Sequence, residues 1–375
     1  MTLCRILPES HRKAGVLRWR SDGGCGQTSW MHSRRDVLAG LGLVAVGSAA
    51  LPRMAEATVS MNRVLPMALG DGDKVAVIAC SSGAENANDF DVARDLIKAL
   101  RLKVVFGLYA TKTNGFLAGT DEERLHDLHA AFADPTVKGI ILLRGGYGAQ
   151  RILDRIDYGL VRRNPKVVVG YSDVTALLVA FWQKAGLVCF HGPVASSSPS
   201  PFSEAWMRHA VGSDLPLGDF GTPPGADFKR VCIVPGVASG RLVGGNLTML
   251  STSLGTPYEI DTRGAILFFE DIGEASYRVD RMITQLRLAG KLSTCSGIAV
   301  GQFTNDTERE PAGAVTWQQV VDSHLQSLGK PAMRGMAIGH VREKVTVPVG
   351  CLATLDSGAL TLSVTEGAVL PKPEN

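Results

Sequence analysis

Short runs of apolar residues alternate with segments of helical spacing between residues 74 and 191. The runs are continuous, as in Lys74–Cys80 and Lys166–Gly170, whereas residues 89–102 place apolar side chains three or four positions apart. A strand that is apolar along its whole length must be buried on both faces, as in a parallel sheet covered by helices. The pattern therefore predicts an α/β fold whose ligands bind at the carboxyl ends of the parallel strands.

The elements expected in this region follow one another in regular order. Strands are predicted at Lys74–Cys80, Lys103–Phe106, Gly139–Leu143, Lys166–Gly170 and Val188–His191. Helices are predicted at residues 89–102 and 120–132, in a short stretch that ends at Ile156, and at residues 173–184. Thr120 and Glu123 have the spacing of a capping box, which sets the start of the second helix.

The remainder of the chain has a different pattern. Residues 195–229 are rich in Ser, Pro and Gly, which predicts a linker with one short helix around Trp206. The segments that follow predict a second, smaller and β-rich α/β domain, with strands at Val231–Val234, Ala265–Phe269, Gly297–Gln302, Val345–Val347 and Ala359–Val364 and helices at Leu247–Leu254, Tyr277–Ala289 and Thr316–Ser327. The predicted domains are 70–194 and 230–370, joined by the linker 195–229 and preceded by the leader 1–57.

The leader has the three parts of a secretory signal peptide. Ser33–Asp36 contains paired arginines, Val37–Leu51 is uncharged over fifteen residues, and Ala55–Ala57 has small residues at both ends. The uncharged run is too short for a membrane-spanning helix, and paired arginines before a weakly apolar run are typical of the twin-arginine pathway. We expect export to the periplasm, with Met31 as the initiator. A buried N-terminal helix in a cytoplasmic protein is the alternative.

Charge and cysteine content exclude several classes of protein. The net charge is +3 over 375 residues, but residues 1–57 hold eight basic and four acidic residues, which leaves −1 on the rest. We therefore expect no nucleic-acid partner, because such a protein needs a basic patch on its folded part. Five cysteines follow the leader, never in a C-x-x-C pair, and no two histidines have metal-ligand spacing with a carboxylate. No disulfide framework, metal or other cofactor is predicted.

Gly170–Asp173 is the most informative short segment. A buried strand ends there, Ser172 occupies the turn, and an apolar helix follows, which is the pattern of a nucleophile elbow. In such a turn the amide after the serine points toward a developing oxyanion. Two observations favour a structural interpretation: serine is a common helix N-cap, and Val174 stands where the usual motif has glycine.

A glycine-rich turn, Arg144–Gly148, follows another strand of the same predicted sheet. Its three glycines let backbone N–H groups approach an anion closely, although a tight turn between strand and helix would have the same composition. Farther along, Glu270 and Asp271 end an apolar strand, and either could orient a histidine, cap a helix or pair with arginines. His191 and His340 each end a short apolar stretch.

Seven segments in this order resemble the LD-carboxypeptidase family of serine peptidases. The resemblance runs from Lys74 to Val369. The segments are Ala79–Ser82, Arg144–Gly148, Gly170–Asp173, His191–Pro193, Gly244–Leu247, Phe269–Ile272 and Gly339–His340. Each segment is weak alone, but the series spans both predicted domains. The family implies a flavodoxin-like N-terminal domain, a second domain that supplies the acid and the histidine, and a homodimer.

The resemblance also implies roles for particular residues. Ser172, Glu270 and His340 would form a catalytic triad, with an oxyanion hole from the amides of Asp173 and Gly146. The implied substrate is a murein tetrapeptide whose terminal D-Ala is released. Arg144 and Tyr147 are the predicted substrate contacts, and Arg144, Arg151 or a helix N-terminus could hold the terminal carboxylate.

Three other functions compete with this one. The family also contains microcin self-immunity proteins, which need an aromatic side chain to stack on a base, and Trp182, Trp206 and Trp317 are the candidates. A non-catalytic periplasmic binding protein would suit the leader and composition but would not need the triad. A cysteine hydrolase based on Cys189 is weaker, because Cys189 lies within a strand rather than at a turn.

Overall fold

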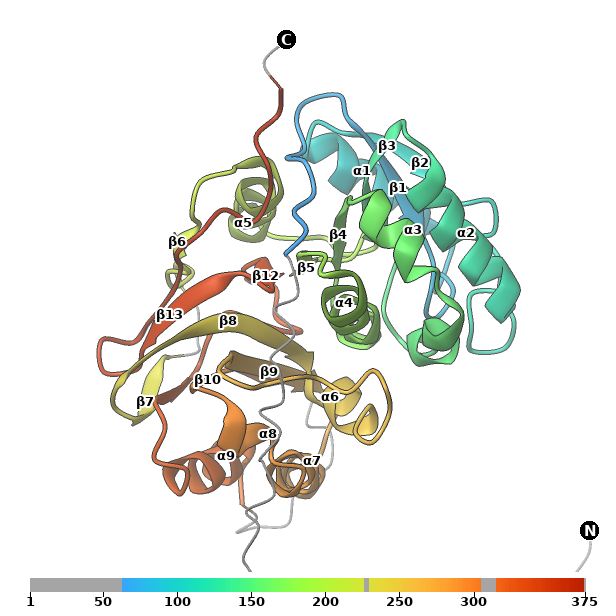
Figure 1. Cartoon of the computed structure of the whole chain (residues 1–375). Helices are drawn as coiled ribbons and strands as arrows, with labels where there is room; N and C mark the ends of the chain where they lie inside the picture. Colours follow the sequence, from blue (N-terminus) through green and yellow to red (C-terminus); the bar gives the residue numbers. More distant parts are fainter. Residues whose placement is uncertain (1–62, 226–228, 305–314, 374–375) are drawn as a thin grey trace, which may run out of the picture. The chain divides into compact units, whose positions relative to one another are not determined.

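The apolar runs form the first of two sheets in the computed structural model, which describes residues 63–225, 229–304 and 315–373 (Figure 1). Its strands are β1 (Lys74–Ile78), β2 (Lys103–Phe106), β3 (Val137–Leu142), β4 (Val167–Gly170), β5 (Cys189–His191) and β12 (Val347–Val349). Their spatial order is β12-β5-β4-β3-β1-β2, and all neighbours are parallel except β12, which runs antiparallel to β5. The predicted parallel sheet is therefore confirmed, with one antiparallel edge. The predicted leader lies outside the described residues.

Helices connect the parallel strands. They are α1 (Asn88–Ala99), α2 (Asp121–Ala133), the 3₁₀ helix η1 (Ala149–Arg155), α3 (Tyr158–Arg163) and α4 (Thr175–Ala180). The capping box at α2 is confirmed, since the Glu123 N–H donates to Thr120 Oγ1 at 3.2 Å and the Thr120 N–H donates to Glu123 Oε2 at 2.8 Å. The helix predicted at residues 173–184 is α4 with a 3₁₀ turn before it (Ser172–Val174) and a π turn after it (Phe181–Ala185).

Successive residues of the central strands bury their side chains on opposite faces of this sheet. In β1, Val75 and Val77 belong to one hydrophobic cluster and Ala76 and Ile78 to another. The second cluster lies under α2, η1, α3 and α4, and the first lies under α1. A fully buried valine or isoleucine contributes about 1.5–3 kcal/mol, so burial on both faces explains why these runs are continuously apolar.

The segment predicted as a linker contains a three-turn helix. Helix α5 (Pro201–Gly212) begins after Ser200, whose side chain accepts from the Ser203 N–H, and has proline at its first position. Met207 on α5 is fully buried in the core. The helix predicted around Trp206 is therefore confirmed, and proline at its first position favours helix formation. The short strand β6 (Gly218–Asp219) follows.

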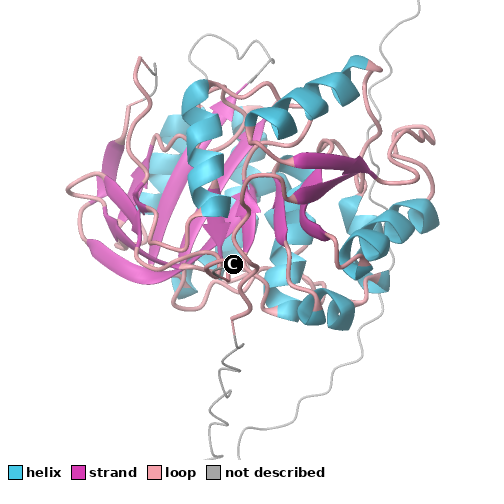
Figure 2. Ribbon diagram, turned by 90° about the horizontal axis from the view of Figure 1, so that it is seen from above, coloured by secondary structure: helices cyan, strands magenta, loops and turns pink. Residues whose placement is uncertain are grey.

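The second sheet has eight strands in the order β6-β14-β13-β8-β9-β10-β11-β7. Besides β6 they are β7 (Val231–Val234), β8 (Val237–Asn246), β9 (Ile266–Ile272), β10 (Gly297–Thr304), β11 (Ala332–Arg334), β13 (Leu352–Asp356) and β14 (Thr361–Val364). Its helices are α6 (Leu247–Thr252), α7 (Ser276–Leu288), α8 (Lys291–Thr294) and α9 (Trp317–Gln326). Figure 2 shows helices beside both sheets. Strands β8, β11 and β13 were not expected from the sequence.

The two sheets share one hydrophobic cluster. It includes Val77 of β1 and Phe190 of β5 together with Leu242 of β8 and Phe268 of β9. Strand β12 strengthens the connection, because it comes from the C-terminal part of the chain yet pairs with β5 in the first sheet. The strand predicted at Val345–Val347 therefore lies two residues later and in the other sheet. This shared core fixes the carboxyl ends of β4 and β9 relative to each other.

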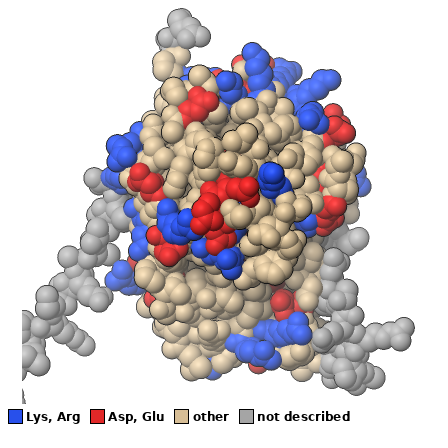
Figure 3. Space-filling view, turned by 90° about the vertical axis from the view of Figure 1, so that its right-hand side faces the viewer, with Lys and Arg blue, Asp and Glu red and all other residues tan. Residues whose placement is uncertain are grey.

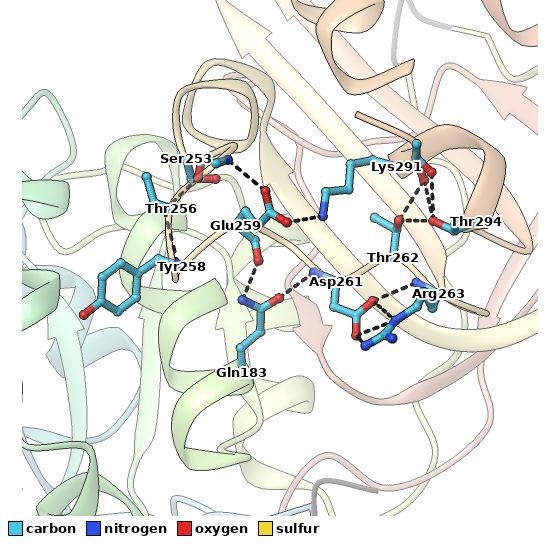
Figure 4. Close-up of polar contacts among 12 residues, drawn as sticks. Gln183, Ser253, Thr256, Tyr258, Glu259, Asp261, Thr262, Arg263, Lys291 and Thr294 are labelled. Atoms are coloured by element: carbon cyan, nitrogen blue, oxygen red, sulfur yellow. Dashed lines mark hydrogen bonds and ion pairs between the residues drawn. The ribbon is translucent and has the colours of Figure 1, made fainter. Parts of the chain in front are cut away.

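A polar connection reinforces the junction (Figure 4). The Gln183 side chain donates to the Glu259 carbonyl at 2.8 Å and accepts from the Asp261 N–H at 2.5 Å. Glu259 and Asp261 lie in the loop that leads into β9. One amide side chain from the first sheet's helical layer therefore satisfies two backbone groups of that loop.

The surface formed by α2, η1 and α3 carries charges of both signs. Exposed ion pairs join Arg151 to Asp121 and Arg155 to Glu122. Figure 3, which views the molecule from the right-hand side of Figure 1, shows acidic and basic side chains interspersed on this face. Within the described residues, no helix is long and apolar enough to cross a membrane.

Candidate active site

Ser172 lies at the sharp turn between β4 and the helix that follows. Its φ of 63° is in the left-handed region, which is uncommon for a residue other than glycine and costs about 1–2 kcal/mol. Its hydroxyl caps neither the 3₁₀ turn nor α4, so the N-cap interpretation of this serine is not what the structure shows. A strained backbone that raises an uncapped hydroxyl at a strand end is the geometry of a nucleophile elbow.

The glycine-rich turn packs directly against this serine. A Cβ atom at Gly145 would lie 2.8 Å from Cβ of Ser172, so only glycine fits there. Two side chains tie the turn to its neighbours: the Tyr147 N–H donates to Ser82 Oγ at 3.1 Å, and the Ala149 N–H donates to Asp173 Oδ2 at 2.8 Å. Asp173, the residue after the serine, therefore holds the elbow and the turn together.

Glu270 and His340 form a close pair at the end of β9. His340 Nδ1 lies 2.7 Å from Glu270 Oε2, and the Glu270 side chain is fully buried. Burial disfavours the charged form of Glu270, but the positive charge of a protonated His340 and contacts with both His340 and His191 lower its pKa to about 2. Gly339 has a φ of 116°, and a Cβ there would lie 2.6 Å from Glu270 Oε2, so the glycine before His340 lets the pair approach.

His191 faces the other oxygen of the same carboxylate. Its Nε2 lies 3.5 Å from Glu270 Oε1, and both side chains are buried. The two atoms have no hydrogen-bond partner among the described residues, so the ring and the carboxylate are close without hydrogen-bond alignment. No role was predicted for His191 from the sequence. Its position at a strand end before Gly192-Pro193 was the available signal.

Asp271, the neighbour of Glu270, has a separate structural task. It accepts from Asn246 Nδ2, from the Thr248 N–H and from Thr248 Oγ1, each at 2.8 Å. Burial and the charge of Glu270 raise the pKa of Asp271 to about 6. Consecutive residues of a strand point to opposite sides, so only one of the two carboxylates reaches a histidine.

A cavity of about 570 Å³ opens above these residues. It is lined by Ser172, His340, Gly145, Gly146 and Tyr171, and by the cations Arg144, Arg342 and Lys344. The ring of Tyr171 lies 4.7 Å from that of His340 between centroids. The volume falls in the ordinary range of small-molecule sites, about 300–1,000 Å³. Ser172, His340 and the glycine-rich turn, predicted separately, therefore meet at one cavity.

The residues predicted to contact substrate differ in position. Arg144 lines the cavity, but its guanidinium donates to Glu85 Oε1 at 2.5 Å and to the Gly83 carbonyl at 3.2 Å. Tyr147 is half exposed, packs edge-on against Phe116 and is not part of the cavity lining. Arg151 binds Asp121 through two hydrogen bonds and also lies outside the lining.

The competing chemistries lack support in this site. Cys189 is buried within β5, and burial raises the pKa of its thiol well above the ordinary value, which opposes a thiolate nucleophile. All five cysteines in the described part of the chain are free. The described residues hold no group of three or more His, Cys, Asp or Glu side chains that could bind a metal ion.

Comparison with known proteins gives a consistent result. Residues 75–192 match the LD-carboxypeptidase N-terminal domain, and residues 239–355 match the LD-carboxypeptidase C-terminal domain. A probable murein peptide carboxypeptidase of Bacillus subtilis is 39% identical over 324 residues, which cover 81% of this chain and 96% of the relative. The chain therefore belongs to the LD-carboxypeptidase family.

Two solved structures show the same fold. A muramoyltetrapeptide carboxypeptidase from Oxalobacter formigenes has a TM-score of 0.67 and 31% identity, and the match covers 80% of this chain and 100% of that one. An MccF-like protein from Bacillus anthracis has a TM-score of 0.73 and 27% identity, with 81% and 99% covered. This chain is thus similar in structure both to a muramoyltetrapeptide carboxypeptidase and to an MccF-like protein.

Proposed function

We propose that this protein is a serine LD-carboxypeptidase that releases the terminal D-Ala from murein tetrapeptide. The observation that carries the proposal is the position of His340, which lines the same cavity as the strained Ser172 and lies 2.7 Å from the buried Glu270 carboxylate. A serine at its ordinary pKa is a poor nucleophile and needs a base, and the base needs an orienting carboxylate. The three residues supply one group of each kind.

In the proposed reaction, His340 Nε2 takes the proton of the Ser172 hydroxyl as Oγ attacks the scissile carbonyl. Glu270 holds Nδ1 of the ring, which fixes the tautomer and stabilises the imidazolium. The Ser172 hydroxyl makes no hydrogen bond to a described residue. Its hydrogen bond to His340 is expected to form with the substrate in place, when the atoms approach to about 3 Å.

The remaining steps follow from the same groups. The amides of Asp173 and Gly146 are proposed to stabilise the tetrahedral oxyanion, which is supported by the contact between the glycine-rich turn and Ser172. His340 then protonates the leaving amine of D-Ala. Water attacks the acyl-enzyme by the same route, with His340 as base and Ser172 as leaving group.

Two observations favour a murein peptide over a peptide–nucleotide toxin as substrate. The names of the Bacillus subtilis and Oxalobacter formigenes relatives refer to murein and muramoyl peptides. In addition, none of the described tryptophans lines the cavity: Trp182 contacts Arg241, Trp206 packs on Phe220, and Trp317 packs on Phe303. Base stacking of the kind expected for an immunity protein would therefore need another aromatic residue.

We also propose that the protein is exported to the periplasm and acts there as a homodimer. The twin-arginine pattern of the leader supports export, and the family resemblance supports the dimer. Replacement of Arg34 and Arg35 by lysine should retain a reporter fusion in the cytoplasm. Sedimentation of the purified protein should give twice the chain mass. A fusion exported without the arginines would contradict the pathway.

The deciding assay for the activity uses the full chain and a murein tetrapeptide that ends in D-Ala. Free D-Ala is followed by mass spectrometry, with the Ser172→Ala variant in parallel. Release by wild type and not by the variant supports the proposal. Equal release by both would exclude Ser172 as nucleophile. Absence of release by wild type would exclude this substrate, and a peptide–nucleotide conjugate would then be assayed.

A further inference from the structure

Lys344 is a mostly buried cation that lines the active-site cavity. Its residue exposure is 8%, and it follows His340 by four positions on the same loop. Neither a hydrogen bond nor an ion pair joins its ammonium to any residue in the described part of the chain. The ammonium lies over the face of the Tyr171 ring, whose centroid is 4.1 Å from Nζ.

A buried ammonium without an anionic partner is unfavourable, because it has lost water and gained little in return. The Tyr171 ring provides only a cation–π contact. The carboxylate whose charge acts on Lys344 is Glu270, and that group already contacts two histidines. Burial accordingly lowers the pKa of Lys344 to about 8, which still leaves the ammonium mostly protonated at neutral pH.

The other two cations of the cavity differ from Lys344. Arg144 is already paired with Glu85 at 2.5 Å. The Arg342 side chain is 79% exposed and lies 3.9 Å from Glu343. Among the cavity's cations, Lys344 is therefore the one that is both mostly buried and unpaired within the described residues.

We propose that Lys344 binds the terminal carboxylate of the peptide substrate. This inference rests on the proposed carboxypeptidase function and adds the residue that distinguishes a chain end from an internal peptide bond. The carboxylate of a C-terminal residue is three covalent bonds from the scissile carbonyl carbon, so its binding group must lie beside the nucleophile. Tyr171 provides that proximity, because it precedes Ser172 and contacts both His340 and Lys344.

The loop that carries Lys344 is held in place from α5. Ser203 Oγ accepts from the Lys344 N–H at 2.8 Å and donates to the Arg342 carbonyl at 2.9 Å. The same hydroxyl therefore fixes the backbone on either side of Glu343. Such anchoring positions the ammonium before substrate arrives, which lowers the entropic cost of binding.

The test measures binding in the inactive Ser172→Ala background by calorimetry. Two ligands are compared: the tetrapeptide with a free terminal carboxylate and the same tetrapeptide with a terminal carboxamide. The free acid should bind at least about 10-fold more tightly than the amide, since the charge pair is shielded from water. Addition of Lys344→Met should reduce this preference to within about 2-fold, because it weakens binding of the free acid and not of the amide.

Two matched variants remove a positive charge elsewhere in the cavity. Arg342→Gln, two residues away, should keep the preference for the acid, which controls for general loss of positive potential. Arg144→Gln should also keep it. An unchanged preference for the free acid in Lys344→Met would overturn the proposal, and so would loss of that preference in Arg144→Gln instead. Release of D-Ala by wild type would in either case leave the proposed function standing. If neither peptide bound, the substrate assignment and this inference would fail together.

Thermal unfolding separates binding from a structural role. Because the unpaired ammonium opposes folding and methionine packs well on an aromatic ring, Lys344→Met should unfold at the same temperature as wild type or higher. A clearly lower Tm together with equal losses of affinity for acid and amide would show that Lys344 only supports the loop.

Discussion

Two groups of charged residues at the junction of the sheets are built in opposite ways. In the loop before β9, Glu259 accepts from the Gly255 N–H at 2.8 Å and from Lys291 Nζ at 2.9 Å, while Gln183 satisfies two backbone groups (Figure 4). In the cavity, Lys344 has no anionic partner among the described residues, and His191 and Glu270 face each other without a hydrogen bond.

The difference separates residues that hold the fold from residues that act on a ligand. Hydrogen-bond and ion-pair partners offset the cost of desolvating a polar group. A network in which every group has a partner therefore stabilises the chain but has no free group to bind a substrate. An unsatisfied or strained group costs stability, and the surrounding core must offset that cost. Substitutions in the cavity should therefore change activity, and substitutions in the loop before β9 should change stability, each largely without the other.

The largest effect is expected at Ser172. Both Ser172→Ala and Ser172→Gly should lower kcat by about 10⁴-fold or more, because each removes the nucleophile. Glycine has no penalty at the φ of 63°, so Ser172→Gly should be about 1 kcal/mol more stable than Ser172→Ala. Urea unfolding of the pair measures the difference, and equal stability would mean that the turn is not strained.

Glu270 should make stability depend on acid pH. Its folded-state pKa of about 2 is below the ordinary 4.5, so its contribution is complete above pH 4.5 and is lost as the pH falls toward 2. Between about pH 5.5 and about pH 3, wild type should lose about 2 kcal/mol more than Glu270→Gln. Parallel curves for the two proteins in urea titrations at both pH values would contradict the low pKa.

His191 should have a smaller effect, on kcat alone. We expect His191→Gln to lower kcat by about 10-fold with KM nearly unchanged, since a misplaced Glu270 would misorient His340 but would not touch the substrate. Steady-state kinetics on the tetrapeptide give both constants. His126→Gln, on an exposed side chain of α2, is the matched control. A change in KM alone would show that His191 acts on binding instead.

The smallest effect is expected from the satisfied region. Gln183→Ala should lower the free energy of unfolding by about 1–2 kcal/mol, because it leaves the Asp261 N–H and the Glu259 carbonyl without their partner. The value of kcat/KM should stay within about 2-fold of wild type. A large loss of activity with normal stability would place this loop in the catalytic machinery and remove the contrast between the regions.

Local patterns predicted much of the first sheet. Strand Lys103–Phe106 and the capping box at Thr120 needed only neighbouring residues to be recognised, and both are confirmed. Strand β8 was missed because its three glycines break any apolar pattern. The helix predicted around Trp206 is α5, which is longer than the short helix expected there. Strand β12 was placed in the wrong sheet, since its partner β5 is more than 150 residues away in the sequence.

The sequence by itself determined the parallel sheet, the turn at Ser172 and, through ordered short segments, the family. These features depend on residues within a few positions of one another, or on motifs that can each be recognised within a short segment. Only the tertiary structure decided that His191 faces the second oxygen of Glu270 and that Lys344 is buried without an anionic partner among the residues that the structure describes. Burial and pairing depend on which distant segments meet, and that is set by the core shared between the two sheets.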